Sequence, residues 1–196
     1  DGVGVRYVST PEEIQGARAL ILPGTKHTLA DLAWLRERGL DRAVFRFKGP
    51  VIGICGGFQM LGRSLEDPEG SDGGRPARVR GLGLLPTRTV FLQKKTTRLV
   101  SAESLLGFAK GVRLRGYEIH MGETQGGRPA FRTSRSDGAV RGRVWGTYLH
   151  GFFDKPEFRR WYLDHLRDRY DVPKPPSVRR TDSDPYDDLA DAESKH

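Results

Sequence analysis

The order of structural elements is decided by residues 51–62, which read VIGICGGFQMLG. The apolar run after Pro50 predicts a short buried strand, and the apolar residues from Phe58 onward predict a helix. Cys55, the only cysteine in the chain, falls at the turn between them. The following helix N-terminus favours a thiolate, and the G-x-C-x-G pattern is the thiol counterpart of the strained serine turn of hydrolases. We therefore predict that Cys55 is a nucleophile.

A lone cysteine more often packs as a small buried hydrophobe. Glycines at positions 53, 56 and 57 favour the nucleophile instead. Each glycine costs roughly 0.5–1 kcal/mol in a regular element, and a structural cysteine does not need them.

The segments before this turn predict an α/β fold. An apolar strand at 19–22 stops at Pro23-Gly24, and a helix capped by Thr28 then continues to Gly39. The strand at 51–54 comes next. Strands and helices in alternation are typical of a parallel sheet covered by helices, so we expect a mostly parallel open sheet flanked by helices.

The second half of the chain predicts added antiparallel strands and a closing helix. Residues 66–80 are rich in glycine, proline and charge and predict an exposed loop. Apolar stretches at 84–85, 90–92, 112–121 and 144–149 predict strands. Asp154 and Glu157 form a capping-box pattern that opens a helix. Its apolar face is predicted to be core and consists of Phe158, Trp161, Tyr162, Leu166 and Tyr170.

Composition predicts one domain over residues 1–170, followed by an acidic, proline-containing tail over 171–196. The net charge of +8 divides into +11 for the domain and −3 for the tail. A basic surface suits nucleic acid, a polyanionic small molecule or an acidic partner, but no nucleic-acid-binding motif accompanies it. No apolar run approaches the roughly 20 residues that cross a bilayer. With a single cysteine, this predicts a cytoplasmic protein without nucleic acid or membrane partners.

Two further motifs accompany the cysteine. Residues 145–151 read WGTYLHG, in which His150 ends a predicted strand and could serve as the base, although a structural histidine is the alternative. Residues 22–26 read LPGTK, a turn whose amides could join that of Gly56 in an oxyanion hole, although an ordinary Pro-Gly turn is the alternative. Such a donor contributes roughly 3–4 kcal/mol to catalysis. No metal-ligand pattern accompanies them, so we expect no metal.

Together these motifs resemble a class I (triad-type) glutamine amidotransferase domain. The motif GYEIHMG at 116–122 resembles the cobyric acid synthase branch of that family. The resemblance covers about residues 1–170 and implies a flavodoxin-like fold that lacks its first strand. It also implies that Cys55 attacks the side-chain amide of glutamine, giving a thioester and ammonia, while His150 moves the protons. The residues that would hold glutamine and its oxyanion are Gly24, Thr25, Gly56 and Gln59.

The resemblance further implies a larger synthase, of which this chain is a fragment or a separate subunit. Ammonia would pass to an ATP-dependent synthetase domain, where ATP and Mg²⁺ are expected, to amidate carboxylates b, d, e and g of a corrin in cobalamin biosynthesis. The chain itself has no G-x-x-x-x-G-K-[ST] phosphate loop, so we expect no cofactor within it.

One departure from the family pattern concerns the third triad member. The usual triad has a glutamate two residues after the histidine, where this chain has Phe152. A Cys–His dyad is the simplest interpretation, with Glu118 and Asp154 as candidates to orient His150, although Asp154 is better explained as a helix cap.

Three alternative functions stay open at this point. The chain could be the amidotransferase subunit of another ligase, such as cobyrinic acid a,c-diamide synthase or a cell-wall glutamate-amidating enzyme. It could be a stand-alone cysteine hydrolase, which would need no synthetase. It could also be a nucleic-acid-binding module, whose binding would depend steeply on salt and not on Cys55.

Overall fold

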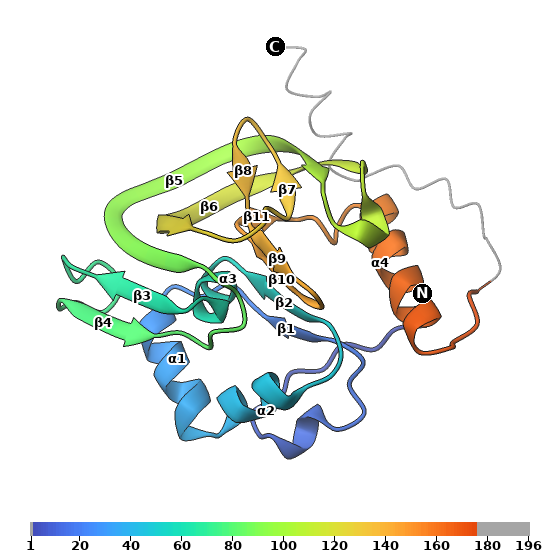
Figure 1. The fold of residues 1–196 in the computed structure, drawn as a ribbon, viewed down its shortest axis with the longest axis horizontal. Coiled ribbons are helices and arrows are strands. Elements are labelled where there is room, and N and C mark those ends of the chain that lie inside the picture. The colour runs from blue at the N-terminus through green and yellow to red at the C-terminus, as the bar shows by residue number, and fades with distance from the viewer. Residues whose placement is uncertain (1, 176–196) are drawn as a thin grey trace, which may run out of the picture.

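The computed structural model describes residues 2–175 of the chain (Figure 1). The predicted tail at 171–196 therefore lies outside the described residues from position 176 onward, and the division at residue 170 stays a prediction. The helices are α1 (Thr28–Glu37), α2 (Leu40–Arg46), α3 (Gly56–Leu61) and α4 (Pro156–Arg169), with 3₁₀ turns η1 (Glu12–Ile14) and η2 (Gly107–Ala109). None of the helices in this part of the chain is long and apolar enough to span a membrane.

The first sheet carries the parallel strands that the sequence predicts. Its order is β1 (Leu20–Leu22), β2 (Val51–Ile54), β10 (Val144–Thr147) and β9 (Ala139–Arg141). β1 and β10 both run parallel to β2, and β9 runs antiparallel to β10. The carboxyl ends of β1, β2 and β10 consequently meet at one edge, where open α/β sheets bind ligands.

The second sheet is more extensive than the sequence indicates. Its main strands are β11 (Leu149–His150), β6 (Arg113–Gln125), β5 (Arg88–Ser104), β3 (Ser64–Asp67) and β4 (Ala77–Arg80), in that order. β7 (Phe131–Arg132) pairs with β5, and β8 (Ser136–Asp137) pairs with β7. β5 and β6 form a long curved antiparallel hairpin (Figure 1). The strand expected at 90–92 is thus a small part of β5.

Three sequence predictions in this half need correction. The predicted loop at 66–80 is bounded by strands, because β3 and β4 pair antiparallel across it. The predicted strand at 84–85 is wrong, since Leu84 and Leu85 pack in the core without joining a sheet. The predicted strand at 144–149 is interrupted at Tyr148, so β10 and β11 lie in different sheets.

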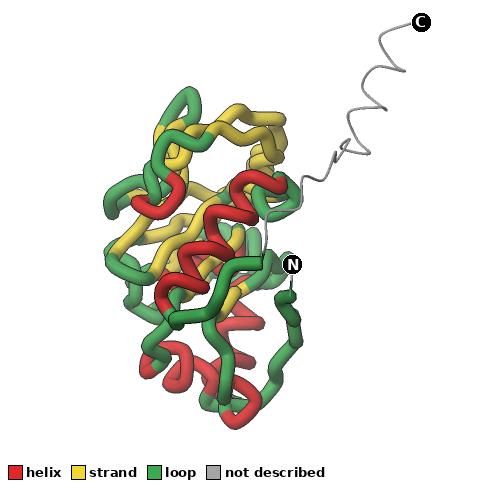
Figure 2. The backbone as a smooth tube through the Cα atoms, turned by 90° about the vertical axis from the view of Figure 1, so that its right-hand side faces the viewer, coloured by secondary structure: helices red, strands yellow, loops and turns green. Residues whose placement is uncertain are grey.

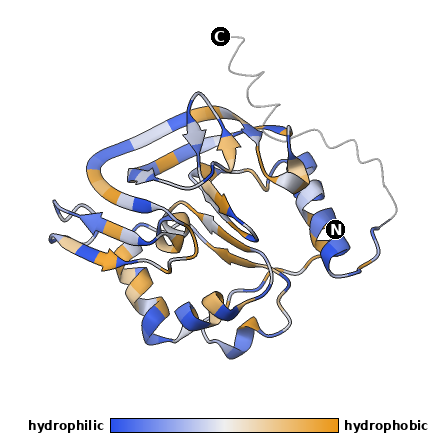
Figure 3. Ribbon diagram, in the orientation of Figure 1, coloured by the Kyte–Doolittle hydropathy of each residue, from blue (hydrophilic) through white to orange (hydrophobic). Residues whose placement is uncertain are grey.

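Two apolar cores cover opposite faces of the first sheet, because successive residues of a strand point to opposite sides. Val51 of β2 belongs to the core under α1, α2 and α3, and its neighbour Ile52 to the core under α4. Val144 and Trp145 of β10 divide in the same way. Figure 3 shows the apolar strands inside and the polar helix surfaces outside, and in Figure 2 α4 lies across the strands.

The closing helix largely follows its sequence pattern. Phe158 and Tyr162 are buried and pack on Trp145. The predictions for Trp161 and Tyr170 are wrong, because Trp161 is 54% exposed and Tyr170 follows the end of α4 and belongs to neither core. The predicted capping box is wrong, because α4 begins at Pro156 and Lys155 occupies the N-cap position without a side-chain capping bond. Proline suits this first position, where no helical N–H bond is lost.

A buried carboxylate organises the loop between β3 and β4. Asp67, fully buried at the end of β3, accepts hydrogen bonds from the amides of residues 71, 72 and 73. The loop thereby presents Asp72 to the first turn of α1, where its carboxylate accepts from the amides of Thr28 and Leu29, each at 2.9 Å. Thr28 was predicted to cap α1, but a carboxylate 44 residues away holds its amide instead. This contact fixes the start of α1 beside the candidate site.

Candidate active site

Cys55 lies at a strained turn between β2 and α3. Its backbone has φ +52° and ψ −111°. Non-glycine residues rarely adopt positive φ, and such strain persists only where the surrounding structure enforces it. Here the amide of Cys55 donates to Thr147 of β10 at 2.9 Å, and its carbonyl accepts from Gln59 at 3.0 Å. The turn therefore holds the thiol at the carboxyl edge of the first sheet.

The glycines around Cys55 are required by close backbone contacts. A Cβ on Gly57 would lie 2.0 Å from the Leu22 carbonyl oxygen, and one on Gly53 would lie 2.6 Å from the Cα of Phe58. The amide of Gly57 also donates to Pro23 at 3.1 Å. α3 is therefore packed directly against the end of β1, with no room for a side chain between them.

We expect Gly57→Ala to destabilise the fold by at least about 3 kcal/mol, because backbone must move to admit the methyl group. Gly107→Ala is the matched control, since a Cβ there meets nothing within 4 Å. The control should stay within about 0.5 kcal/mol of the parent, as is usual for surface changes. Urea denaturation would measure both, and equal midpoints for the two variants would refute this account of α3.

The structure brings Cys55, His150 and Gly24 together. A Cβ built on Gly24 would lie 3.5 Å from the Cβ of Cys55 and 3.5 Å from Cε1 of His150. The two side chains thus approach the same point, beside the turn that follows β1. The Nε2 atom of His150 is buried and has no hydrogen-bond partner among the described residues. A buried ring nitrogen without a partner is available to a thiol or to a bound substrate.

The predicted oxyanion residues border this point. Gly56 is the first residue of α3, and a Cβ there would lie 3.2 Å from the amide nitrogen of Thr25. The backbones of Thr25 and Gly56 are therefore adjacent, next to Gly24. The hydroxyl of Thr25 donates to Asp31 of α1, which ties this turn to the helix that Asp72 holds. Two backbone amides in this arrangement suit an oxyanion.

Gln59 occupies a different environment from the other predicted residues. It is 2% exposed, and its side-chain carbonyl accepts from Thr28 at 3.2 Å. Its amide donates to the Met121 carbonyl at 3.0 Å and to the Tyr148 hydroxyl at 3.1 Å. In this structure Gln59 links α3 to α1 and β6, and its contact with glutamine stays a prediction.

Burial raises the pKa of the Cys55 thiol, and the hydrogen bond from the Gly56 amide only partly offsets that effect. The sequence-based expectation of a favoured thiolate therefore does not hold for the free chain. The thiol instead donates to the Ile119 carbonyl of β6 at 3.3 Å. A neutral thiol needs a base, and the unpartnered nitrogen of His150 is the candidate for that role.

The raised pKa predicts that alkylation of Cys55 by iodoacetamide is slow near pH 7 and rises at more alkaline pH than in the urea-unfolded chain. The thiolate is the reacting form, and burial disfavours its charge. Because Cys55 is the only cysteine, the mass gain of the intact chain reports its rate directly. An inflection at the same or a lower pH in the folded chain would contradict the prediction.

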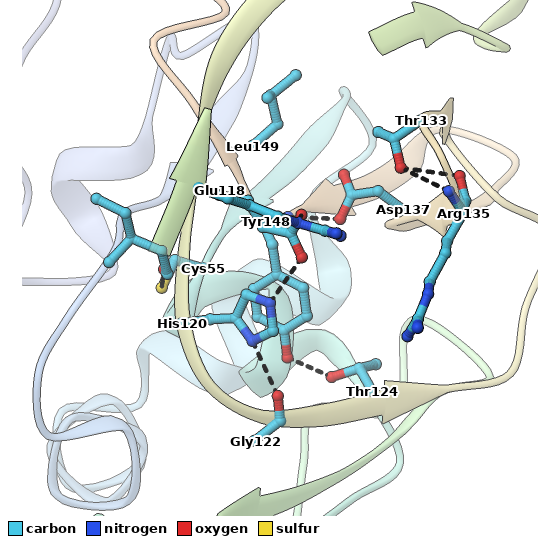
Figure 4. Close-up of polar contacts among 12 residues, drawn as sticks. Cys55, Glu118, His120, Gly122, Thr124, Thr133, Arg135, Asp137, Tyr148 and Leu149 are labelled. Carbon is cyan, nitrogen blue, oxygen red and sulfur yellow. Dashed lines mark hydrogen bonds and ion pairs between the residues drawn. The ribbon is translucent and has the colours of Figure 1, made fainter. Parts of the chain in front are cut away.

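Glu118, a candidate for orienting His150, has other partners. Its carboxylate accepts from Arg98 at 2.6 Å and pairs with Nε2 of His120 at 2.9 Å, as Figure 4 shows for His120. Burial acts to raise the pKa of Glu118, but the bonds from Arg98 and His120 outweigh it and hold the pKa below its usual range. The His120 ring also stacks on Tyr148, with centroids 3.8 Å apart.

The other candidate, Asp154, forms no hydrogen bond or ion pair with His150 among the described residues. Phe152, in the position of the usual glutamate, is buried against Trp145 and Phe158. No ion pair between His150 and a carboxylate is found among the described residues, and the same residues contain no cluster of metal-ligating side chains. The geometry fits the predicted Cys–His dyad.

Sequence reasoning missed two contributors to the site. The Ile119 carbonyl receives the thiol, and buried Asp137 accepts from Thr147 and from the amide of Tyr148 at the end of β10. Burial raises the pKa of Asp137, and these hydrogen bonds oppose that effect. Ile119 lies within the motif at 116–122, although that motif assigned it no role, whereas Asp137 lies in no recognised motif.

Comparisons with known proteins agree with this geometry. The family model described as the CobB/CobQ-like glutamine amidotransferase domain matches residues 1–158. A cobyric acid synthase from Herpetosiphon aurantiacus is 49% identical over 84% of this chain and 35% of its own length. One from Roseiflexus castenholzii is 46% identical over 96% of this chain and 40% of its own length. The chain thus spans about two fifths of the length of these curated relatives.

Solved structures share the fold. A crystal structure titled as a glutamine amidotransferase superposes with a TM-score of 0.60 at 19% identity, covering 84% of this chain and 87% of that chain. A putative GMP synthase protein from Thermoplasma acidophilum superposes with a TM-score of 0.56 at 13% identity, covering 82% and 78%. At these identities the likeness supports the predicted α/β fold, with mixed open sheets flanked by helices.

Proposed function

The chain belongs to the CobB/CobQ-like glutamine amidotransferase family, and we propose that it is the glutaminase part of a cobyric acid synthase. The observation that carries the proposal is the strained turn at Cys55 with His150 beside it. Both side chains lie 3.5 Å from the same point next to Gly24, and Nε2 of His150 has no partner among the described residues. A partly buried thiol next to an available imidazole suits acyl transfer from an amide.

In the proposed mechanism His150 accepts and returns a proton twice, once while the thioester forms and once while it is hydrolysed. Nε2 takes the proton of the Cys55 thiol as sulfur attacks the side-chain carbonyl carbon of glutamine. The amides of Gly24, Thr25 and Gly56 stabilise the oxyanion. The C–N bond then breaks as the imidazolium gives its proton to the leaving amide nitrogen, which departs as ammonia. Water, deprotonated by His150, attacks the thioester, releasing glutamate and restoring the thiol.

The ammonia would serve an ATP-dependent synthetase domain that completes the length seen in the relatives. In this proposal ATP and Mg²⁺ bind that domain, which amidates the b, d, e and g carboxylates of a corrin in the cytoplasm. This chain needs no cofactor for its own half of the reaction. Since a thiol of raised pKa is a weak nucleophile, docking of the synthetase is expected to stimulate hydrolysis.

The outer face of the β5–β6 hairpin offers a surface for that domain. Leu99 and Tyr117 lie opposite each other in the hairpin and are 65% and 58% exposed. Tyr117 also lies opposite His150 in β11. Adjacent exposed apolar side chains favour a protein partner. Tyr117 lies in β6, two residues before Ile119, whose carbonyl accepts the Cys55 thiol.

The proposal is tested by glutamine hydrolysis with and without a purified cobyric acid synthase synthetase domain. We expect stimulation in the parent chain, and at least about a tenfold loss of stimulation in Leu99→Asp, because a charge is buried at the interface. Phe45→Asp is the matched control, because Phe45 is 63% exposed, much like Leu99, but lies on α2 and not on the hairpin. Stimulation by a cobyrinic acid a,c-diamide synthetase alone, or full hydrolysis of γ-glutamyl substrates without any synthetase, would overturn the proposal.

A further inference from the structure

A second candidate site lies at the end of α3 that is remote from Cys55. There the surface forms a hollow of about 430 Å³ where α3 is followed by β3. Its lining is mostly arginine, and consists of Arg63, Ser64, Arg78, Val79, Arg80 and Arg88. A hollow of this volume is large enough for a small molecule with several charged groups.

Strand register explains why the arginines gather. Ser64 of β3 pairs with Arg80 of β4 on one side and with Arg88 of β5 on the other. Paired residues project from the same face of a sheet, so two guanidinium groups flank one serine. Arg78 lies two residues from Arg80 along β4 and therefore shares that face. The β3–β4 end of the sheet is at the left of Figure 1.

The backbone of this region is fixed. The amide of Arg63 donates to Thr87 at 2.7 Å, and its carbonyl accepts from Gly81 at 2.9 Å. Arg36 of α1 donates to the carbonyls of Arg80 and Gly81, which ties the end of β4 to that helix. The arginines that line the hollow thus project from a backbone held by hydrogen bonds.

The positive charges of the hollow are poorly balanced. Arg78 pairs with Glu66 at 3.2 Å, but Arg63, Arg80 and Arg88 form no ion pair with any of the described residues. The Ser64 hydroxyl is buried between them, again without a partner in the described part of the chain. Gathered like charges repel, so this arrangement destabilises the empty hollow and favours an anion within it.

We propose that this hollow binds a compact polyanion with adjacent phosphate or carboxylate groups. Arginine forks bind both groups through paired, charge-assisted hydrogen bonds. The hydroxyl of Ser64 can donate to the same anion. Glutamine has no net charge and is bound at the other end of α3 in the proposed reaction, so this second site does not depend on glutaminase activity.

The test is calorimetric titration of the full chain with tripolyphosphate and with citrate. We expect saturable binding of at least one probe, and the tighter probe identifies phosphate or carboxylate as the preferred group. In Arg80→Gln/Arg88→Gln the dissociation constant should rise at least about tenfold, because charge-assisted hydrogen bonds are lost. Arg88→Gln alone, with a smaller rise, serves if the double variant does not fold.

The matched control is Arg42→Gln/Arg46→Gln, which removes the same charge from α2. Its affinity should stay within about twofold of the parent if the hollow itself binds the anion. The inference is overturned if neither probe saturates, if loss of Arg80 and Arg88 leaves the affinity unchanged, or if the control weakens binding equally.

Discussion

Replacing Cys55 with alanine is expected to lower glutamine hydrolysis on the order of 10³-fold or more, because removal of the nucleophile eliminates the covalent route. Cys55→Ser should be almost as inactive, since a hydroxyl at this strained turn is a much weaker nucleophile. Ammonia release from glutamine in the presence of the synthetase domain is the measurement.

The fold must survive these changes for the result to be informative. Cys55 contributes its thiol hydrogen bond to Ile119 and partial core packing, so Cys55→Ser should unfold near the parent midpoint in urea. Substantial hydrolysis by a folded Cys55→Ala chain would show that the thiol is not the nucleophile.

His150→Gln is expected to lower the turnover rate of glutamine hydrolysis by about 10² to 10⁴, the usual contribution of general acid–base catalysis. The Michaelis constant should change little, because the histidine is proposed to move protons rather than to bind glutamine. The alkaline shift of Cys55 alkylation should persist, since burial causes it.

His165→Gln provides the control for this prediction. His165 lies on α4 and stacks on Phe108 of η2, and among the described residues no hydrogen bond, ion pair or ring contact joins it to those proposed for catalysis. Its loss should leave turnover near the parent value. If His150→Gln retained parent turnover, or if both histidine variants lost it equally, the assigned role of His150 would be wrong.

The parts of the site that the sequence predicted are those that depend on the local backbone and on the order of the motifs. Gly53 is needed by a contact with Phe58 only five residues away, and the apolar runs at 19–22 and 51–54 correspond to the strands β1 and β2. Parallel pairing brings the ends of β1, β2 and β10 to one edge, and His150 follows the end of β10 by three residues, in β11 of the second sheet. The order of the motifs was therefore sufficient to predict that Cys55, Gly24 and His150 meet.

The parts that the sequence did not predict depend on distant contacts. Asp72 holds the start of α1 from 44 residues away, and Ile119 receives the thiol from 64 residues away. The break at Tyr148 is likewise set by the buried Asp137, which bonds its amide between two sheets. Neither hydrophobic periodicity nor helix caps report such pairings, because both describe only neighbours along the chain.

The pKa of Cys55 illustrates the same limit. The sequence showed the helix N-terminus and the Gly56 amide, which both favour a thiolate. It did not show that Cys55 is buried beneath β6, and this burial raises the pKa of the thiol by more than the Gly56 amide lowers it. In the proposed mechanism Cys55 therefore depends on His150 and on a partner domain for its activation.

The most direct test of the central claim is mass analysis of the chain after incubation with a glutamine-like diazo-ketone and the synthetase domain. The account predicts one covalent adduct, located on Cys55, that excess glutamine prevents. A folded chain that gains no adduct, or an adduct on Cys55 that glutamine does not prevent, would contradict the proposal that this thiol attacks the amide of glutamine.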